Sequence, residues 1–238
     1  MQLAMHGDDA DHGRAEGLGL PEPCALYVFD AYCGWCWGAS SLIQELVSAW
    51  APSVPVVVIS GGLFVGPRSA RIDTYPHIPG ANRRIADLTG VRFGDSYDEL
   101  LRDGSFVLDS LGAAAAFAAL RAQAPSRAAG LAHRLQEAFY VHGRSLSEPA
   151  TAIDIARQEG LDAVQVEQDL ESGRAREWAL RDFEMARALE VSSYPTLLAL
   201  HSGQVIPLPC TGASASAITA AAGWPIGTAA SVHHQRTT

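Results

Sequence analysis

Strand-like sequence occurs in only two parts of this 238-residue chain, and a long helical stretch separates them. Near the N-terminus, Ala25–Tyr32 and Val54–Ser60 are apolar and rich in β-branched and aromatic residues, as buried strands are. Near the C-terminus, Thr196–Leu200 and Val205–Leu208 flank a short turn ending in Gly203, a pattern typical of a hairpin. A single sheet must therefore combine strands from both ends of the chain.

A helix is predicted between the first two strands. Apolar residues from Trp37 to Trp50 recur at the three- and four-residue spacing of a helix face, and Pro52 follows them. A strand, helix and strand in this order predict a parallel pair of strands with a right-handed crossover. The next segment, Gly61–Gly80, is rich in glycine and proline and is expected to be a loop.

Residues 81–190 are expected to form an all-helical insertion. Capping residues, prolines at helix starts and glycines at helix ends delimit its helices. The predicted helices are Leu111–Gln123 after a cap at Ser110, Arg127–Val141, Pro149–Glu159, Ala163–Glu171 after a cap at Asp162, and Arg174–Glu190. A last helix is expected at Ser214–Ala222.

The expected domain organisation is a core interrupted by this insertion. Residues 23–80 and 191–225 form the core, residues 81–190 the helical domain, and residues 1–22 and 226–238 a flexible leader and tail. The leader lacks a basic region followed by an apolar stretch, so it does not resemble a secretory signal. No apolar stretch reaches the roughly 18 residues that would span a bilayer. A cytoplasmic protein is therefore expected.

The charge balance disfavours nucleic acid and anionic membranes as partners. The net charge is −9, the isoelectric point is about 5.3, and no basic run occurs. All 17 basic residues are arginine, so mechanisms that need a Schiff-base lysine or a P-loop lysine are excluded. Proteins or small molecules are the expected partners.

The reactive chemistry is concentrated in a CGWC motif at residues 33–36. Because a helix begins within the motif, the Cys33 sulfur lies at its N-terminus, where free amides and the helix dipole favour the thiolate. Cys33 is thus expected to attack a disulfide, and Cys36 to resolve the mixed disulfide. A C-x-x-C pair also forms half of a zinc site, but Cys24 and Cys210 are single and distant in sequence. The redox interpretation is favoured, with no metal and no bound cofactor.

A second notable residue is Pro195, directly before the returning strand. Proline is tolerated as the first residue of a strand, and the sequence by itself does not require a cis bond there. Together, the cysteine pair and this proline resemble the thioredoxin superfamily. The resemblance implies an α/β thioredoxin-like fold with a central mixed sheet, and a cis bond between Tyr194 and Pro195 that faces the cysteine pair.

Further segments resemble the DsbA-like branch, and among it the FrnE-type predicted protein disulfide isomerases. These segments are FDAYCGWCWGA, SGGLF, RIADLTG, LDSLGAA, AFYVHGR and YPT, between residue 26 and about residue 212. The resemblance implies a thiol:disulfide oxidoreductase or protein disulfide isomerase whose catalytic residues are Cys33, Cys36 and Pro195. Protein disulfides and dithiols are the implied substrates, and glutathione or another thiol is the implied redox partner.

Four residues are candidates for contact with substrate. Trp35 would supply apolar area beside the cysteines, and Tyr194 precedes the proline. Gly62 follows a strand end, where it either lines a groove or only permits a turn. Tyr140 belongs to the helical insertion, which is expected to form one wall of a groove that holds Trp35. Its neighbour Phe139 is a candidate for the same apolar contacts, or is core, since it shares a helix face with Leu131 and Leu135.

The chain departs from its relatives at two positions. Thioredoxins carry a buried acid six residues before the first cysteine, where this chain has Tyr27, and the nearest acid, Asp30, is expected to have a structural role. DsbA oxidants have a histidine inside the cysteine pair, where this chain has Gly34 and Trp35. A less oxidising couple is therefore expected.

Two other functions stay open. One is a glutathione-using enzyme resembling kappa-type transferases and 2-hydroxychromene-2-carboxylate isomerases, although these carry serine at the position of Cys33. The other is a holdase that binds unfolded clients without redox chemistry. Cys24 and Cys210 are expected at opposite ends of the sheet, where they cannot bond, with Cys210 at the active-site end and open to a regulatory role.

Overall fold

The computed structural model describes residues 19–51 and 53–224, so the expected tail at 226–238 and most of the expected leader lie outside it. Within these residues, four strands form one mixed sheet in the order β2-β1-β3-β4. The strands are β1 (Cys24–Phe29), β2 (Val56–Ser60), β3 (Thr196–His201) and β4 (Gln204–Leu208). β1 is parallel to β2 and antiparallel to β3, and β3 and β4 form the hairpin. The predicted mixed sheet and parallel pair are confirmed.

The helices cover most of the rest of the described chain. They are α1 (Gly34–Trp50), α2 (Ile78–Thr89), α3 (Asp95–Asp103), α4 (Ser110–Gln123), α5 (Ala128–Tyr140), α6 (Pro149–Gln158), α7 (Ala163–Glu171), α8 (Arg174–Ala188) and α9 (Ala215–Ala222). Helices α2 to α8 follow β2 and precede β3, while the division into two domains stays a prediction. Within the described residues, no helix has the length and apolar character needed to cross a bilayer.

The predicted helices are found with ends that differ by no more than two residues, whereas α2 and α3 are not among them. Helix α2 begins at Ile78, inside the expected loop, because Pro79 takes one of the first helical positions, where its missing N–H costs nothing. Helix α4 is capped by Asp109 rather than Ser110, since the Asp109 carboxylate accepts from the Leu111 N–H at 3.0 Å. The cap at Asp162 is confirmed, and Ser214 is the cap of α9 rather than its first residue.

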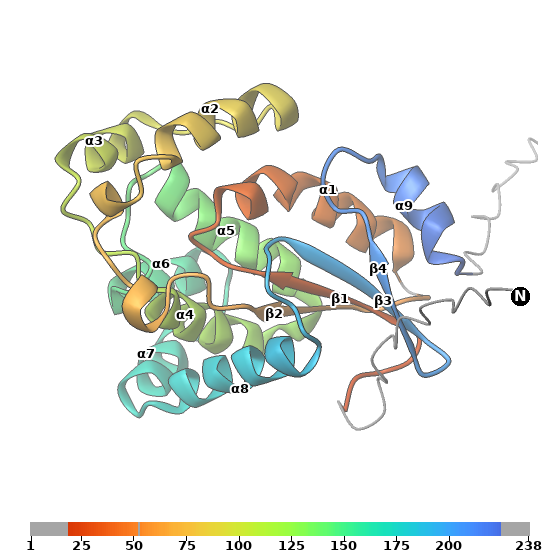
Figure 1. Ribbon diagram of the computed structural model, residues 1–238. Coiled ribbons are helices and arrows are strands. Elements are labelled where there is room, and N and C mark those ends of the chain that lie inside the picture. Colours follow the sequence, from red (N-terminus) through yellow and green to blue (C-terminus); the bar gives the residue numbers. More distant parts are fainter. Residues whose placement is uncertain (1–18, 52, 225–238) are drawn as a thin grey trace, which may run out of the picture.

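Helices cover both faces of the sheet, with α1 and α8 on opposite sides (Figure 1). Along β1, Tyr27 and Phe29 pack into the buried cluster that includes residues of α1 and α4, whereas Leu26 and Val28 pack into the cluster that includes Ala186 of α8. This alternation is the two-residue period of a strand. It turns Tyr27 toward the helix that carries the cysteine pair.

An ion pair covers the outer edge of β2. Arg121 pairs with Asp182 at 2.8 Å, and both side chains are largely buried. The Arg121 guanidinium also donates to the Val58 carbonyl at 2.7 Å. Asp182 accepts from the Ser60 N–H at 2.9 Å. The pair thus satisfies backbone groups that a further strand would otherwise occupy.

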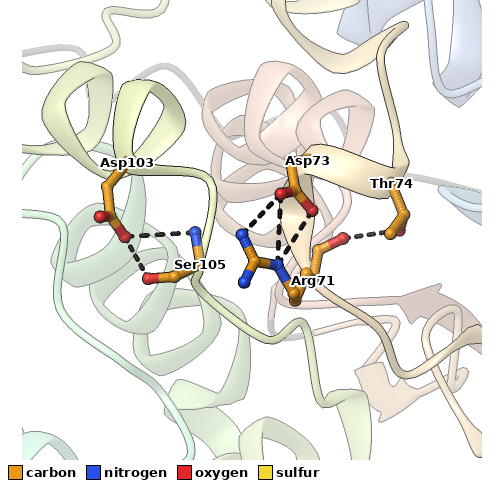
Figure 2. Close-up of polar contacts among 5 residues, drawn as sticks. All are labelled: Arg71, Asp73, Thr74, Asp103 and Ser105. Atoms are coloured by element: carbon orange, nitrogen blue, oxygen red, sulfur yellow. Dashed lines mark hydrogen bonds and ion pairs between the residues drawn. The ribbon is translucent and has the colours of Figure 1, made fainter.

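The segment between β2 and α2 is held against the connection from α3 to α4. Arg71 and Val107 form an isolated bridge, and the Ile72 N–H donates to the Phe106 carbonyl at 2.7 Å. Figure 2 shows the exposed polar contacts along this segment, including the ion pair of Arg71 with Asp73. The buried side chain of Ile72 is thereby fixed as part of the wall of the cavity described below.

The two ion pairs generate a stability prediction. We expect Asp182→Asn to lower the free energy of unfolding by about 3 kcal/mol, because it leaves the Arg121 charge without its partner in a largely buried position. Asp73→Asn removes the acid of an exposed pair and should leave the urea midpoint nearly unchanged. Urea unfolding followed by circular dichroism measures both. Equal losses in the two variants would contradict the assignment of the β2 edge to the buried pair.

Candidate active site

Cys33 lies at the junction between β1 and α1. It is the N-cap residue of α1, with extended backbone angles, and its carbonyl accepts from the N–H groups of Cys36 and Trp37 at 3.0 and 3.1 Å. The helix therefore begins within the CGWC motif, as predicted. No side chain caps this end of the helix. The first-turn amides and the positive end of the helix dipole are available to a charge on the Cys33 sulfur.

The glycines of this segment allow α2 to pack on the first turns of α1. A Cβ at Gly34 would lie 3.0 Å from Ile85 Cδ1, and a Cβ at Gly38 would lie 2.8 Å from Ile85 Cγ2. Any side chain at these two positions would push Ile85 away. Gly34 and Gly38 are one helical turn apart, and this spacing is the sequence signal for the close packing.

Cys36 is enclosed by the protein. It has no exposed surface, whereas Cys33 retains 7%. Burial first, and then the neighbouring Cys33 sulfur, raise the pKa of the Cys36 thiol well above its usual value. Cys36 therefore keeps its proton at neutral pH in the reduced protein. All four cysteines are free thiols in this structure.

Two sulfurs contact the loop before β3. The bond between Tyr194 and Pro195 is cis. The Cys33 thiol donates to the Tyr194 carbonyl at 3.4 Å, and the Cys210 thiol donates to the Pro195 carbonyl at 3.2 Å. Cys24 is paired with Leu200 at the other end of β3, so Cys24 and Cys210 lie at opposite ends of the sheet as expected. The loop thus faces the reactive cysteine.

Tyr27 lies beneath the cysteine pair. Its ring is 2% exposed, and its hydroxyl has no hydrogen-bond partner among the described residues. Burial raises the pKa of Tyr27 well above its usual value, and the sulfurs of Cys36, Cys210 and Cys33 raise it further, in that order. The position of the thioredoxin acid is therefore occupied by a phenol that stays neutral. Tyr27 therefore places an uncharged group beside the sulfurs.

Asp30 supports the backbone around the site. Its carboxylate accepts from the Tyr32 N–H at 2.9 Å and from the Leu63 N–H at 2.7 Å. Burial raises its pKa, and hydrogen bonds from Ser110, Leu63 and Tyr32 oppose that shift. Asp30 therefore has a structural role that is not a cap of α1, because it ties the end of β1 to the loop after β2.

A cavity of about 120 Å³ opens beside Cys33. The cysteine, Trp35 and the loop residues Leu63 and Phe64 line one part of it. Helices of the insertion supply the other walls, with Ile78 and Ile85 from α2, Tyr97 from α3, and Phe139 and Tyr140 from α5. The structure therefore brings Tyr140 and Trp35 to the same cavity as Cys33, with the insertion as a wall.

An aromatic stack supports this cavity from behind. Trp37 stacks on Tyr140 and on His133, with ring centroids 5.9 and 5.1 Å apart. Tyr140 is 1% exposed, so its ring is a core group at the cavity wall. Trp37 is buried as expected, while His133 is held by a hydrogen bond of 3.1 Å with Ser40. The described residues contain no group of three or more side chains suited to hold a metal ion.

Gly61 and Gly62 accommodate aromatic rings. A Cβ at Gly61 would overlap the Tyr194 ring at 1.9 Å, and the Tyr194 hydroxyl donates to the Gly61 carbonyl. Gly62 has a positive φ of 77°, and a Cβ there would lie 3.2 Å from the Phe183 ring. Gly62 thus forms a turn, and it lines a second cavity rather than the one beside Cys33.

Comparison with known proteins places this chain in a family. Residues 26–208 match the model of the DSBA-like thioredoxin domain, and the chain belongs to that family. The fold is accordingly the thioredoxin-like fold of DsbA proteins with its mixed sheet, as the sequence predicted. No curated protein sequence matches the chain significantly.

Several solved structures are similar. The cytosolic disulfide reductase DsbM from Pseudomonas aeruginosa shares 28% identity with a TM-score of 0.68, over 78% of this chain and 89% of DsbM. A protein from Nitrosomonas europaea, provisionally assigned as a protein disulfide isomerase, shares 19% identity with a TM-score of 0.72, over 84% and 95% of the two chains. A 2-hydroxychromene-2-carboxylate isomerase shares 15% identity with a TM-score of 0.51, over 77% and 88%. The latter two similarities concern the fold alone.

Two tyrosine hydroxyls near the site should differ in their effect on stability. Tyr27→Phe removes a buried hydroxyl that lacks a partner, so the free energy of unfolding should stay equal or rise. Tyr32→Phe removes the acceptor of the Leu146 N–H, whose hydrogen bond is 2.9 Å long. It should cost about 1 to 3 kcal/mol. Urea unfolding of both variants tests this difference, and a larger loss in Tyr27→Phe than in Tyr32→Phe would refute it.

Proposed function

We propose that this chain is a thiol:disulfide oxidoreductase that reduces or isomerises disulfides through Cys33 and Cys36. The observation that carries the proposal is the unequal placement of the two sulfurs. Cys33 caps a helix N-terminus beside an open cavity, whereas Cys36 is fully buried behind it. This arrangement separates an attacking sulfur from a resolving one.

The reaction proceeds by two exchanges. The Cys33 thiolate attacks one sulfur of a substrate disulfide, forms a mixed disulfide and releases the other substrate sulfur. Cys36 then gives up its proton and attacks Cys33, which closes the Cys33–Cys36 disulfide and releases the second substrate sulfur. Both released sulfurs leave as thiols after taking up the two protons lost by the cysteines. One substrate disulfide is reduced, and two protein thiols are oxidised.

The loop before β3 supports the first exchange. We assign Pro195 and Tyr194 to alignment of the substrate backbone, because the Tyr194 carbonyl already accepts the Cys33 thiol in the free protein. A substrate that reaches Cys33 must displace this contact. Trp35 would contact the substrate at the cavity beside Cys33, where Tyr140 forms the buried wall, and Gly62 would contact it at the cavity that Tyr194 also lines.

The relatives support a reducing direction. DsbM is a cytosolic disulfide reductase, and its structure has also been solved with GSH. Glutathione or another thiol would return the Cys33–Cys36 disulfide to the dithiol, with two thiols oxidised to one disulfide. On this proposal the protein acts in the cytoplasm on protein disulfides and needs no bound cofactor. The similar hydroxychromene isomerase shares the fold, but Cys33 and Cys36 favour thiol exchange.

Serine variants test the two roles. Cys33→Ser should abolish reduction of insulin disulfides, because no other described thiol lies at a helix N-terminus beside the cavity. Cys36→Ser should trap the mixed disulfide, which mass spectrometry detects as an adduct on Cys33. Cys24→Ser, at the opposite end of the sheet, is the matched control and should retain full activity. Full activity in Cys33→Ser would rule out the mechanism, and prevention of insulin aggregation without reduction would support a holdase.

A further inference from the structure

A second cavity borders the loop after β2, whose residues Leu63 and Phe64 line the first cavity. Its volume is about 420 Å³, and Gly62 and Tyr194 belong to its lining. Apolar side chains, among them Leu111, Leu180 and Phe183, form much of its surface. Leu180 is 36% exposed, which is unusual for a large apolar side chain in this protein. The cavity is therefore accessible and partly apolar.

Two arginines, Arg68 and Arg187, give this cavity a positive charge, and no carboxylate is among its lining residues. Within the described part of the chain, neither arginine forms an ion pair, not even Arg187 with Glu184 or Glu190 on either side of it in sequence. This is a local positive site in a chain with a net charge of −9.

Each arginine is positioned by one hydrogen bond to the backbone. The Arg68 guanidinium donates to the Gly62 carbonyl at 3.3 Å, and the Arg187 Nε donates to the Phe183 carbonyl at 3.3 Å. A guanidinium has five N–H donors in a planar fork, so most donors of both side chains remain free for a ligand. Carboxylates are the groups that this fork recognises best among the common parts of peptides.

Tyr194 connects the cavity with the reacting sulfur. Its ring lies on Gly61 at the border of the cavity, while its carbonyl accepts the Cys33 thiol at 3.4 Å. Tyr194 therefore contacts Cys33 through its backbone and lines the cavity that contains the two arginines. The charged cavity adjoins the place where the substrate disulfide must lie.

We infer that this cavity binds the carboxylate-bearing part of a small peptide thiol or disulfide, with Arg68 and Arg187 as its specificity residues. The inference rests on the proposed function, which it extends by naming a substrate class. Oxidised glutathione serves as the probe. Its reaction with the reduced protein yields the Cys33–Cys36 disulfide and two molecules of glutathione, which take up the two protons released by the cysteines.

The experiment compares small disulfides of different charge. The reduced protein is mixed with oxidised glutathione, neutral hydroxyethyl disulfide or cationic cystamine, and the remaining thiols are counted after acid quenching. We expect Arg68→Gln with Arg187→Gln to slow the reaction with oxidised glutathione about tenfold, since two exposed charge contacts are lost. The reaction with hydroxyethyl disulfide should change by less than about twofold. Arg68→Glu with Arg187→Glu should slow oxidised glutathione further and accelerate cystamine.

A charge-matched control separates local recognition from net charge. Arg176→Glu with Arg181→Glu makes the same charge change on exposed positions of α8 that do not line the cavity. In this variant the three disulfides should keep the same order of reaction rates as in the wild type. High salt should reduce the difference in rate with oxidised glutathione between the wild type and the glutamine variant. Thermal unfolding verifies that each variant is folded.

The outcomes distinguish failure of the arginine site from failure of the proposed function. Equal effects on all three disulfides, no effect on any, or the same change in the α8 control would overturn the arginine site while leaving the proposed function intact. A wild-type protein that reacts with none of the three disulfides would overturn the proposed function itself.

Discussion

The start of α1 is the constraint on which the rest of the site depends. Because the helix begins at Gly34, Cys33 lies at its N-terminus as the N-cap residue, and within the first turn Cys36 is buried in the core. The two cysteines therefore differ in burial because they occupy different positions at the start of α1. The helix in turn is held by the sheet beneath it and by α2 above its first turns, where Gly34 and Gly38 allow the approach of Ile85.

The helices between β2 and β3 form walls of both cavities near Cys33 and Tyr194. Helices α2, α3 and α5 form walls of the cavity beside Cys33, and α8 contributes Arg187 to the charged cavity that Tyr194 lines. Asp30 connects two segments of the site, since its carboxylate accepts from backbone N–H groups after the end of β1 and in the loop after β2. The substrate surface is thus formed by segments far apart in sequence, which the parallel pair of β1 and β2 and the returning strand β3 bring together.

Much of this fold could be predicted from the sequence, because apolar residues recur with different periods in strands and in long helices. Ser214 and Asp162 are also residues of the types that commonly cap helices. The start of α2 was missed because its proline resembled part of a loop. Within the site, the motif at residues 33–36 indicated the chemistry, while the partners of Asp30 and the cavity at Arg68 and Arg187 depend on tertiary packing. The close approach of the Tyr194 ring to Gly61 could not be predicted, because nothing in the sequence around Gly61 indicates it.

Mapping the disulfides of the oxidised protein tests whether Cys33 and Cys36 form one two-electron couple. The protein is equilibrated with mixtures of reduced and oxidised glutathione, free thiols are alkylated under acid quench, and peptides are identified by mass spectrometry. The account predicts one transition in which Cys33 and Cys36 become a disulfide while Cys24 and Cys210 remain thiols. A disulfide that includes Cys210, or the absence of any bond between Cys33 and Cys36 under oxidising conditions, would contradict it.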